Sequence, residues 1–358
     1  MATRVAINGF GRIGRLFFRQ AFGMSGIEIV AINDLGDVDN LAYLLQYDTV
    51  YHRYARQVSG SNEKGTITVD GKAVKVLQVK DPTQLPWKAM NIDIVIEATG
   101  LFESFEKASV HVKAGAKRVV LTAPAKDADG AVGSTVLMGV NDAMLATCTV
   151  SSNASCTTNS AAPVMQVLSR DPGILKALLG TVHAMTTTQN LADGPVRGGH
   201  PVVEAAGAHH AEVDFRRGRT ASANIVPSST GAAIAVTRAV PELKGKFDGL
   251  AYRVPVVTGS LSEITFVAKR RTSADEINAI LTRASQEPRW KGILAVTRDQ
   301  LVSSDIIGAP YGALVDLNFT QVVDGDLVKV LSWYDNEWGY VSTLVKHVLK
   351  ISELLARN

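Results

Sequence analysis

Cysteine is scarce in this chain, and its scarcity excludes one class of protein. The 358 residues contain two cysteines, Cys148 and Cys156. Two thiols cannot build the disulfide framework that holds small secreted domains together. We therefore expect a reducing compartment, in which a thiol is kept for reactivity or for packing.

Charge of one sign is not in excess either, and long apolar runs are missing. The chain has 37 Lys and Arg residues against 34 Asp and Glu, a formal net charge of +3. This balance is too even to predict a nucleic-acid or membrane surface. No apolar run is long enough for a membrane span, and the start MATRVAINGFGRIG lacks the pattern of a signal peptide. We expect a cytoplasmic protein with no membrane partner and no primary role in nucleic-acid binding.

The length and the apolar content predict two closely joined domains. Hydrophobic residues make up 46% of a chain that is long for a single core. In the first part, short β-branched runs alternate with helical stretches, which predicts a doubly wound parallel sheet. These runs are residues 5–9, 27–34, 92–100, 117–124 and 148–152.

From residue 178 onward the apolar runs are longer, as is typical of a mainly antiparallel second domain. The final segment, residues 341–356, has apolar residues at helical spacing and predicts a helix that packs against a sheet. The fold class that we predict is α/β plus α+β.

The motif GFGRIG places Gly9, Gly11 and Gly14 directly after a predicted strand and at the start of a predicted helix. Such glycines permit a tight turn, close approach of the backbone to a pyrophosphate, and close helix packing. By itself the motif is equally compatible with a glycine-rich turn that binds nothing. Asp34, however, ends the next strand, where a carboxylate accepts hydrogen bonds from ribose hydroxyls and repels a 2′-phosphate. Together these features predict a Rossmann domain that binds NAD rather than NADP.

Cys156 lies in SSNASCTTNSAAP, between a predicted strand and a segment that is helical beyond its first turn. Backbone N–H groups and the dipole at a helix amino terminus favour a thiolate. Pro163 is awkward for a helix that starts as early as Cys156. The alternative for Cys156, and our prediction for Cys148, is the role of a small buried hydrophobic residue.

His183 lies within a predicted strand, in TVHAMTTTQ. A lone histidine is more often structural than catalytic. A thiol nucleophile, however, needs a base or a cation nearby, and that partner is usually distant in sequence. The sequence does not determine how far His183 lies from Cys156.

Six segments, in order and over nearly the whole chain, resemble the phosphorylating glyceraldehyde-3-phosphate dehydrogenases. They are INGFGRIGR, SNASCTTN, TVHAMTTTQ, NIVPSSTGAA, LAYRVPV and SWYDNEWGY. The resemblance implies a homotetrameric enzyme of glycolysis or gluconeogenesis that converts glyceraldehyde 3-phosphate, NAD⁺ and inorganic phosphate to 1,3-bisphosphoglycerate. It also implies a Rossmann domain over residues 1–155, completed by a C-terminal helical segment at 336–358, and a catalytic domain over residues 156–335.

The resemblance implies a role for individual residues. Cys156 would be the nucleophile, forming first a thiohemiacetal and then a thioester, with His183 as its base and thiolate partner. The phosphate-binding positions would be Arg253 and Thr186 for the substrate, and Ser155, Thr157, Arg217, Thr230 and Gly231 for the attacking phosphate. The cofactor positions would be Gly9, Gly11, Arg12, Ile13, Gly14, Asp34, Lys80, Thr122 and Asn336. No metal is expected.

Residues 196–214 depart from the family, whose members have only a handful of residues there. Lengthening a surface loop costs little closure entropy, so this insertion is either a tolerated excursion or a cap on a subunit interface. Its histidines, His200, His209 and His210, match no strong metal motif.

Two other functions remain open at this point. One is erythrose-4-phosphate dehydrogenase, which shares the scaffold and the thiol chemistry. The other is a non-catalytic relative that senses redox state or binds nucleic acid, although an even charge balance gives the latter little support.

Overall fold

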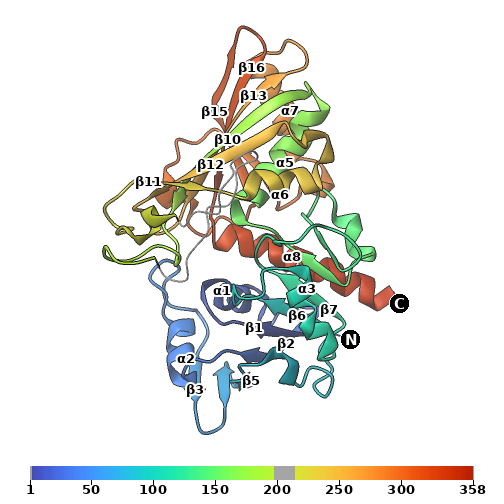
Figure 1. Cartoon of the computed structure of the whole chain (residues 1–358), viewed down its shortest axis with the longest axis vertical. Coiled ribbons are helices and arrows are strands. Elements are labelled where there is room, and N and C mark those ends of the chain that lie inside the picture. Colours follow the sequence, from blue (N-terminus) through green and yellow to red (C-terminus); the bar gives the residue numbers. More distant parts are fainter. Residues whose placement is uncertain (1, 197–213, 358) are drawn as a thin grey trace. The chain divides into compact units, whose positions relative to one another are not determined.

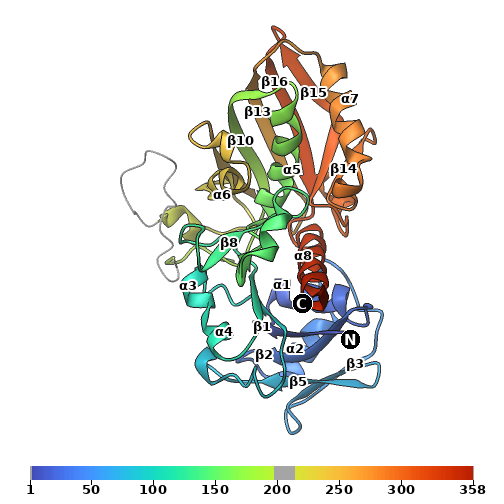
Figure 2. The ribbon, with the colours of Figure 1, turned by 90° about the vertical axis from the view of Figure 1, so that its right-hand side faces the viewer.

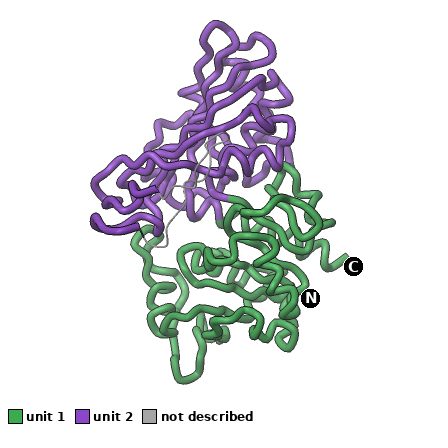
Figure 3. Tube along the Cα trace, viewed as in Figure 1, with its two compact units in different colours: residues 1–154, 341–358 green, residues 155–340 purple. Residues whose placement is uncertain are grey.

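The computed structural model describes residues 2–196 and 214–357, and the chain divides into two compact units. Unit 1 comprises residues 1–154 and 341–358, and unit 2 comprises residues 155–340 (Figure 3). The predicted insertion and its three histidines lie outside the described residues, except for the end residues Val196 and Asp214. Within the described ranges, no helix combines the length and the apolar character that a membrane crossing requires.

Unit 1 is built on a nine-stranded sheet with the order β3-β4-β5-β2-β1-β6-β7-β9-β8 (Figure 1). Neighbouring strands from β5 to β8 in this order are parallel, and β3 and β4 extend the sheet in antiparallel fashion. The strands are β1 (Thr3–Asn8), β2 (Ile27–Asn33), β3 (Val58–Ser61), β4 (Thr66–Val69), β5 (Lys72–Leu77), β6 (Ile94–Glu97), β7 (Arg118–Leu121), β8 (Gly133–Thr135) and β9 (Val150–Ser152).

The helices of unit 1 alternate with these strands along the chain, as the sequence pattern predicts. They are α1 (Arg12–Ala21), α2 (Val38–Gln46), α3 (Phe105–Ala108), α4 (Val110–Lys113) and most of α8 (Trp338–Arg357), with short 3₁₀ turns η1 (Pro82–Gln84) and η2 (Asp142–Ala146). The predicted doubly wound sheet is confirmed. One detail differs, because β9 begins at Val150 and Cys148 therefore lies before the strand, where it is buried.

The central strands of unit 1 place polar residues at one edge of an apolar sheet. Val5, Ile7, Ile94 and Ile96 are fully buried, as is typical of parallel strands covered on both faces. The last residue of β1, Asn8, pairs in register with the last residues of β2 and β6, which are Asn33 and Glu97. The carboxyl ends of three strands therefore meet at one edge, where ligands bind in sheets of this type.

Unit 2 contains a seven-stranded sheet with the order β11-β12-β10-β13-β16-β15-β14 (Figure 2). Four of its six neighbouring pairs are antiparallel, which agrees with the predicted mainly antiparallel domain. The strands are β10 (Ile174–Ala184), β11 (Val226–Ser229), β12 (Phe247–Val254), β13 (Ser260–Ala268), β14 (Leu294–Thr297), β15 (Ala313–Val323) and β16 (Leu327–Tyr334).

Three helices pack on one face of the unit 2 sheet, namely α5 (Cys156–Arg170), α6 (Ala232–Ala239) and α7 (Ala274–Ser285). The 3₁₀ turns of this unit are η3 (Phe215–Gly218), η4 (Pro241–Leu243), η5 (Pro288–Trp290) and η6 (Ser303–Ile306). Along β10, Leu179, Thr181 and His183 are buried while Leu178 and Val182 are exposed. Buried and exposed side chains thus alternate along the strand, which shows that helices cover only one face of β10.

His347 is a fully buried histidine of α8 within unit 1. Its Nε2 lies 2.8 Å from the Ser151 hydroxyl, and its Nδ1 lies 3.2 Å from Oδ1 of Asn153. Burial lowers the pKa of His347 to about 3, because a charged imidazole loses its solvation there. The folded protein therefore holds this side chain neutral at pH values where an unfolded chain would protonate it.

We predict that His347 makes the protein sensitive to acid. An unfolded histidine takes up a proton below about pH 6.5, whereas His347 in the fold does so only near pH 3. Stability is thus fully present above pH 6.5 and falls as the pH drops toward 3, by about 1.4 kcal/mol per pH unit for one proton. Urea unfolding between pH 7.5 and 4.5 should show a shallower pH dependence for His347→Gln than for wild type. Parallel profiles would contradict this prediction.

Candidate active site

The turn between β1 and α1 has the backbone geometry that a dinucleotide requires. Gly9 has φ +94°, and a Cβ there would lie 2.7 Å from backbone atoms of Ala98. A Cβ on Gly14 would lie 2.1 Å from the carbonyl oxygen of Gly9. A Cβ added at Gly11, the N-cap residue of α1, would lie in open space, with no neighbour within 4 Å among the described residues. No side chain forms a capping hydrogen bond at this end of α1. The first N–H groups of α1 are thus accessible to an anion such as a pyrophosphate.

A pocket of about 310 Å³ adjoins this turn in unit 1. Four of the predicted cofactor residues line it, namely Gly9, Gly11, Asp34 and Lys80. The Asp34 carboxylate accepts the N–H groups of Phe10 at 2.7 Å and Gly36 at 2.9 Å, which orients it at the end of β2. A glycine turn open to phosphate and an oriented carboxylate for ribose hydroxyls fit the adenosine half of NAD.

The other residues that line this pocket were not predicted from the sequence. They are Asn8, Asn33, Leu35, Val79, Pro82, Ala98, Thr99, Leu101 and Phe102. The sequence pattern could have indicated some of them. The strands that end in Asn8, Asn33 and Glu97 belong to one parallel sheet, and the carboxyl ends of such strands meet at one edge.

Four other predicted cofactor residues of unit 1 do not line the pocket; these are Arg12, Ile13, Gly14 and Thr122. Arg12 forms an ion pair with Asp48, and its guanidinium lies 5.7 Å from the ring centre of Tyr51. The Thr122 hydroxyl donates to the carbonyl oxygen of Glu97 at 3.1 Å.

Unit 2 brings Cys156 and His183 together. Cys156 is the first residue of α5, and its Sγ lies 3.3 Å from Nε2 of His183 on β10. The helix begins earlier than predicted, because the N-cap hydroxyl of Ser155 accepts the N–H of Thr158 at 3.1 Å. Pro163 lies inside the helix, which continues to Arg170. Proline removes one hydrogen bond there, and the burial of the surrounding helix compensates for it.

Burial acts on the pKa of both members of the pair. Burial raises the pKa of the Cys156 thiol, although Arg253 acts in the opposite direction. Burial and the charge of Arg253 together lower the pKa of His183 to about 3. Loss of solvation thus favours the uncharged form of each group and acts against the effect of the helix terminus. The Cys156 residue as a whole remains partly exposed.

Arg253 and Ala184 compete for the second ring nitrogen of His183. Nδ1 lies 2.7 Å from the Ala184 carbonyl oxygen, which only accepts, and 2.5 Å from Nη1 of Arg253, which only donates. A neutral imidazole carries one N–H group, so one of these hydrogen bonds forms at a time. When Nδ1 donates to Ala184, Nε2 presents a lone pair to the sulfur and can act as a base. When Arg253 donates instead, Nε2 carries the proton and stabilises a thiolate.

Tyr334 is a residue of this site that sequence analysis missed. Its buried hydroxyl lies 2.8 Å from the hydroxyls of both Thr157, next to Cys156, and Thr181, two residues before His183. Its ring lies edge-on to the imidazole of His183, with the ring centres 6.0 Å apart. Tyr334 therefore connects the helix that carries the thiol to the strand that carries the imidazole.

The other predicted residues of unit 2 occupy surrounding turns. Nε of Arg217 in η3 lies 3.9 Å from Oδ2 of Asp214, and neither of these buried atoms has a hydrogen-bond partner among the residues that the structure describes. Burial lowers the pKa of Arg253, and the charge of Arg217 lowers it further, so the two guanidinium groups lie in one region. Two arginines near one another are suited to phosphate groups.

Three predicted residues lie at loop and helix ends. The Thr186 hydroxyl lies 2.9 Å from that of Thr188, just after β10. Thr230 accepts the N–H of Ala232 at 3.2 Å, and Gly231 is the N-cap residue of α6 without a side-chain cap.

Asn336 follows β16 and is buried. Its Oδ1 accepts the hydroxyls of Ser260 at 2.9 Å and Thr258 at 3.1 Å. These two bonds orient the amide, so that its nitrogen is the group available to a ligand carbonyl. In the described part of the chain, no group of His, Cys, Asp and Glu side chains is arranged to hold a metal ion.

A dinucleotide pocket in one unit and a cysteine–histidine pair in the other define a class: oxidoreductases that react through a cysteine thiol. Comparison with known proteins makes this specific. The family model "Glyceraldehyde 3-phosphate dehydrogenase, NAD binding domain" matches residues 3–105, and the corresponding C-terminal domain matches residues 155–336.

Curated relatives match over nearly the whole chain. Glyceraldehyde-3-phosphate dehydrogenases of Streptomyces coelicolor and Clostridium pasteurianum are each 46% identical over 348 residues, covering 96% of this chain and 97% of theirs. The chain belongs to the glyceraldehyde-3-phosphate dehydrogenase family. The predicted family, enzyme class and NAD cofactor are thereby confirmed.

We predict that Tyr334→Phe lowers the reactivity of Cys156. The substitution removes the hydroxyl group to which two buried hydroxyls are hydrogen-bonded. Its loss costs about 1–3 kcal/mol of stability and loosens the link between α5 and β10. We expect the alkylation of Cys156 by iodoacetamide at pH 7, followed by peptide mass spectrometry, to slow by about threefold or more. The rate should fall because Cys156 and His183 are in contact in a smaller fraction of the molecules.

Ser332→Ala is the matched control. Ser332 also lies on β16, and its hydroxyl accepts that of Ser160 on α5 at 3.2 Å, away from Thr157 and Thr181. Equal alkylation rates for Tyr334→Phe and Ser332→Ala would show that Tyr334 does not position the pair.

Proposed function

We propose that this protein oxidises glyceraldehyde 3-phosphate with NAD⁺ and inorganic phosphate to 1,3-bisphosphoglycerate. The observation that carries the proposal is the 3.3 Å contact between Sγ of Cys156 and Nε2 of His183, beside the guanidinium of Arg253. In this proposal residues 1–155, with the C-terminal segment 336–358, hold NAD, and residues 156–335 carry the chemistry. We also propose a cytoplasmic location, where the free thiols of Cys148 and Cys156 would stay reduced.

Cys156 acts as the nucleophile and His183 as the acid and base. As the sulfur bonds to the aldehyde carbon, the thiol proton passes through Nε2 of His183 to the carbonyl oxygen, giving a thiohemiacetal. Nε2 then takes the hydroxyl proton while the carbon loses a hydride, which leaves a thioester on Cys156. NAD⁺ supplies the acceptor for this hydride.

The phosphate groups are held by the arginines and by small residues around the thiol. Arg253 and Thr186 hold the phosphate of the substrate, and Arg217, Ser155, Thr157, Thr230 and Gly231 hold the attacking phosphate. Attack of phosphate on the thioester carbon breaks the carbon–sulfur bond and releases the acyl phosphate. The sulfur recovers a proton from His183, so the site returns to its neutral state.

We predict that Cys156→Ser abolishes turnover, because a serine hydroxyl at this position is a far weaker nucleophile than a thiol. NADH formation from glyceraldehyde 3-phosphate should fall by about 10³-fold or more. His183→Asn, which keeps the shape and loses the base, should lower kcat by about 10²- to 10⁴-fold. Wild type without phosphate should release one NADH per subunit in a burst and then slow, because the thioester is not cleared.

The same assay separates the alternatives. A higher kcat/KM for erythrose 4-phosphate than for glyceraldehyde 3-phosphate would show that erythrose 4-phosphate is the preferred substrate. Undiminished activity in Cys156→Ser, or no NADH with either aldehyde, would contradict the proposed chemistry.

We also propose that the chain assembles into a homotetramer, and that the uncovered face of the unit 2 sheet forms one of its interfaces. On this face Leu178, Val182, Leu250 and Tyr252 are between 39% and 65% exposed. The strands that bear them are neighbours, since β10 pairs with β12 and Val182 lies in register with Tyr252. Contiguous apolar side chains on a broad sheet are typical of surfaces that associate.

We predict that Leu178→Asp disrupts this assembly, because it places a charge within the apolar face. Light scattering should give wild type a mass of four 38.2 kDa subunits and the variant a smaller species. Met144→Asp, which changes an exposed side chain of unit 1, should keep the wild-type mass. A wild-type monomer, or an unchanged mass for Leu178→Asp, would argue against the proposed interface.

A further inference from the structure

A chain of buried polar side chains lies at the edge of the unit 1 pocket, and the proposed function assigns no role to its centre. Glu97 is 3% exposed and His111 is fully buried. They are connected to both the pocket and the core of the unit. In chain order the members are Asn8, Asn33, Trp87, Glu97 and His111.

Glu97 at the end of β6 accepts hydrogen bonds from donors on two sides. Its Oε2 accepts from Nδ2 of Asn8 at 2.6 Å and faces Nε2 of His111 at 2.9 Å. Its Oε1 accepts the N–H of Thr99 at 2.9 Å and the hydroxyl of the same residue. The Thr99 hydroxyl donates in this pair, and its oxygen accepts the N–H of Leu101 at 3.1 Å. A carboxylate, which only accepts, satisfies all of these groups.

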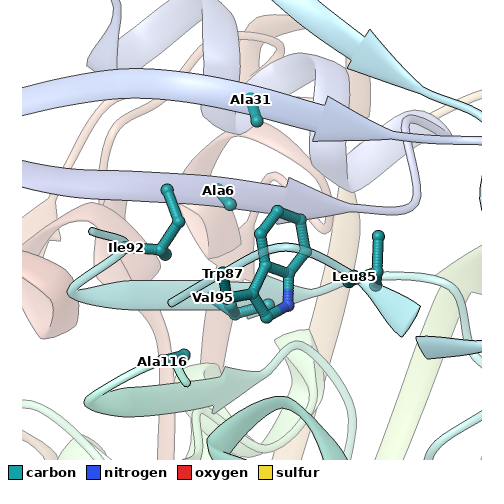
Figure 4. Packing of buried hydrophobic residues seen from close by; sticks show 7 residues of the cluster. All are labelled: Ala6, Ala31, Leu85, Trp87, Ile92, Val95 and Ala116. Carbon is teal, nitrogen blue, oxygen red and sulfur yellow. The ribbon is translucent and has the colours of Figure 1, made fainter. Parts of the chain in front are cut away.

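The packing of Trp87 determines which nitrogen of His111 carries the proton. Trp87 is enclosed by Ala6, Leu85, Val95 and other apolar residues (Figure 4). Its indole N–H, which can only donate, lies 3.1 Å from Nδ1 of His111. Nδ1 must therefore accept, so the neutral imidazole has its proton on Nε2 and donates it to Glu97.

On the other side, Glu97 determines the orientation of the amides that line the pocket. Since Nδ2 of Asn8 donates to Glu97, Oδ1 of Asn8 is left to accept Nδ2 of Asn33 at 2.7 Å. Asn33 then donates to the carbonyl oxygen of Val79 and accepts its N–H, both at 3.0 Å. Asn8, Asn33, Val79 and Thr99 all line the pocket. One buried carboxylate thus orders pocket-lining groups from three strand ends and from the loop after β5.

We propose that Glu97, oriented by His111 and Trp87, is a positioning residue for the NAD site, and this inference rests on the proposed function. Glu97 does not line the pocket and acts through Asn8 and Thr99. Its role is to present the pocket edge in one hydrogen-bonded arrangement before the cofactor binds. The free-energy cost of ordering these groups is then met when the chain folds, so it does not weaken the binding of NAD.

The test is Glu97→Gln, which has nearly the same shape but turns one acceptor into a donor. The new NH₂ group must face either Thr99 or the donors on Asn8 and His111, so one side of the arrangement is lost. The Kd of NAD⁺ by calorimetry and the KM for NAD⁺ should rise about tenfold, equivalent to about 1.4 kcal/mol, the size of one unsatisfied buried group. At saturating NAD⁺, kcat and the KM for glyceraldehyde 3-phosphate should stay within about twofold of wild type, since such a loss is confined to cofactor binding.

Trp87→Phe provides a second variant that retains apolar volume. It removes only the indole N–H, so it should weaken NAD⁺ binding in the same direction by a smaller factor. This variant decides the question if Glu97→Gln does not fold.

His347→Gln is the matched control, because it also replaces a buried hydrogen-bonded side chain of unit 1 but lies outside the pocket. It should lower the melting temperature and leave the Kd of NAD⁺ unchanged. A wild-type Kd in both Glu97→Gln and Trp87→Phe would overturn the inference. So would a rise in Kd of equal size in His347→Gln. Failure of wild type itself to bind NAD⁺ would instead contradict the proposed function.

Discussion

The contact between a thiol and an imidazole is the interaction on which the proposed chemistry depends. Sγ of Cys156 and Nε2 of His183 lie 3.3 Å apart, on a helix start and on a strand. Burial raises the pKa of the thiol and lowers the pKa of the imidazole, because a charge on either group loses its solvation there. Arg253, on the strand beside His183, supplies the nearby positive charge. The sulfur thus lies next to a possible base and close to a fixed positive charge.

Both units use the ends of secondary-structure elements to hold reactive or ligand-binding groups. In unit 1 the turn before α1, the last residues of β1 and β2, and the loop after β6 line the pocket. In unit 2 the start of α5 carries the thiol, and hydroxyls bonded to Tyr334 connect that helix to β10. Rigid, apolar elements determine where these ends lie, and polar side chains then fix the orientation of individual groups.

The predictions from sequence succeeded where the information is local. A glycine turn is visible as three glycines at a set spacing, and the structure gives each one a steric reason. The start of α5 was predicted too late, because the burial that tolerates Pro163 depends on surroundings outside the motif, whereas the cap from Ser155 to Thr158 is local and could have been predicted. Tyr334, Glu97 and His111 were missed because each acquires its partners from segments distant in the chain. The assigned phosphate and cofactor roles remain predictions.

The sequence by itself determined the two-part α/β and mainly antiparallel architecture, the family, and the dinucleotide turn. These follow from periodicity, spacing and long matching segments, which are properties of neighbouring residues. Only the tertiary structure decided that the thiol meets the imidazole, that both groups lose solvation, and that one buried carboxylate orders the edge of the pocket. Distances between remote segments and the loss of solvation arise when the chain packs, and no local pattern encodes them.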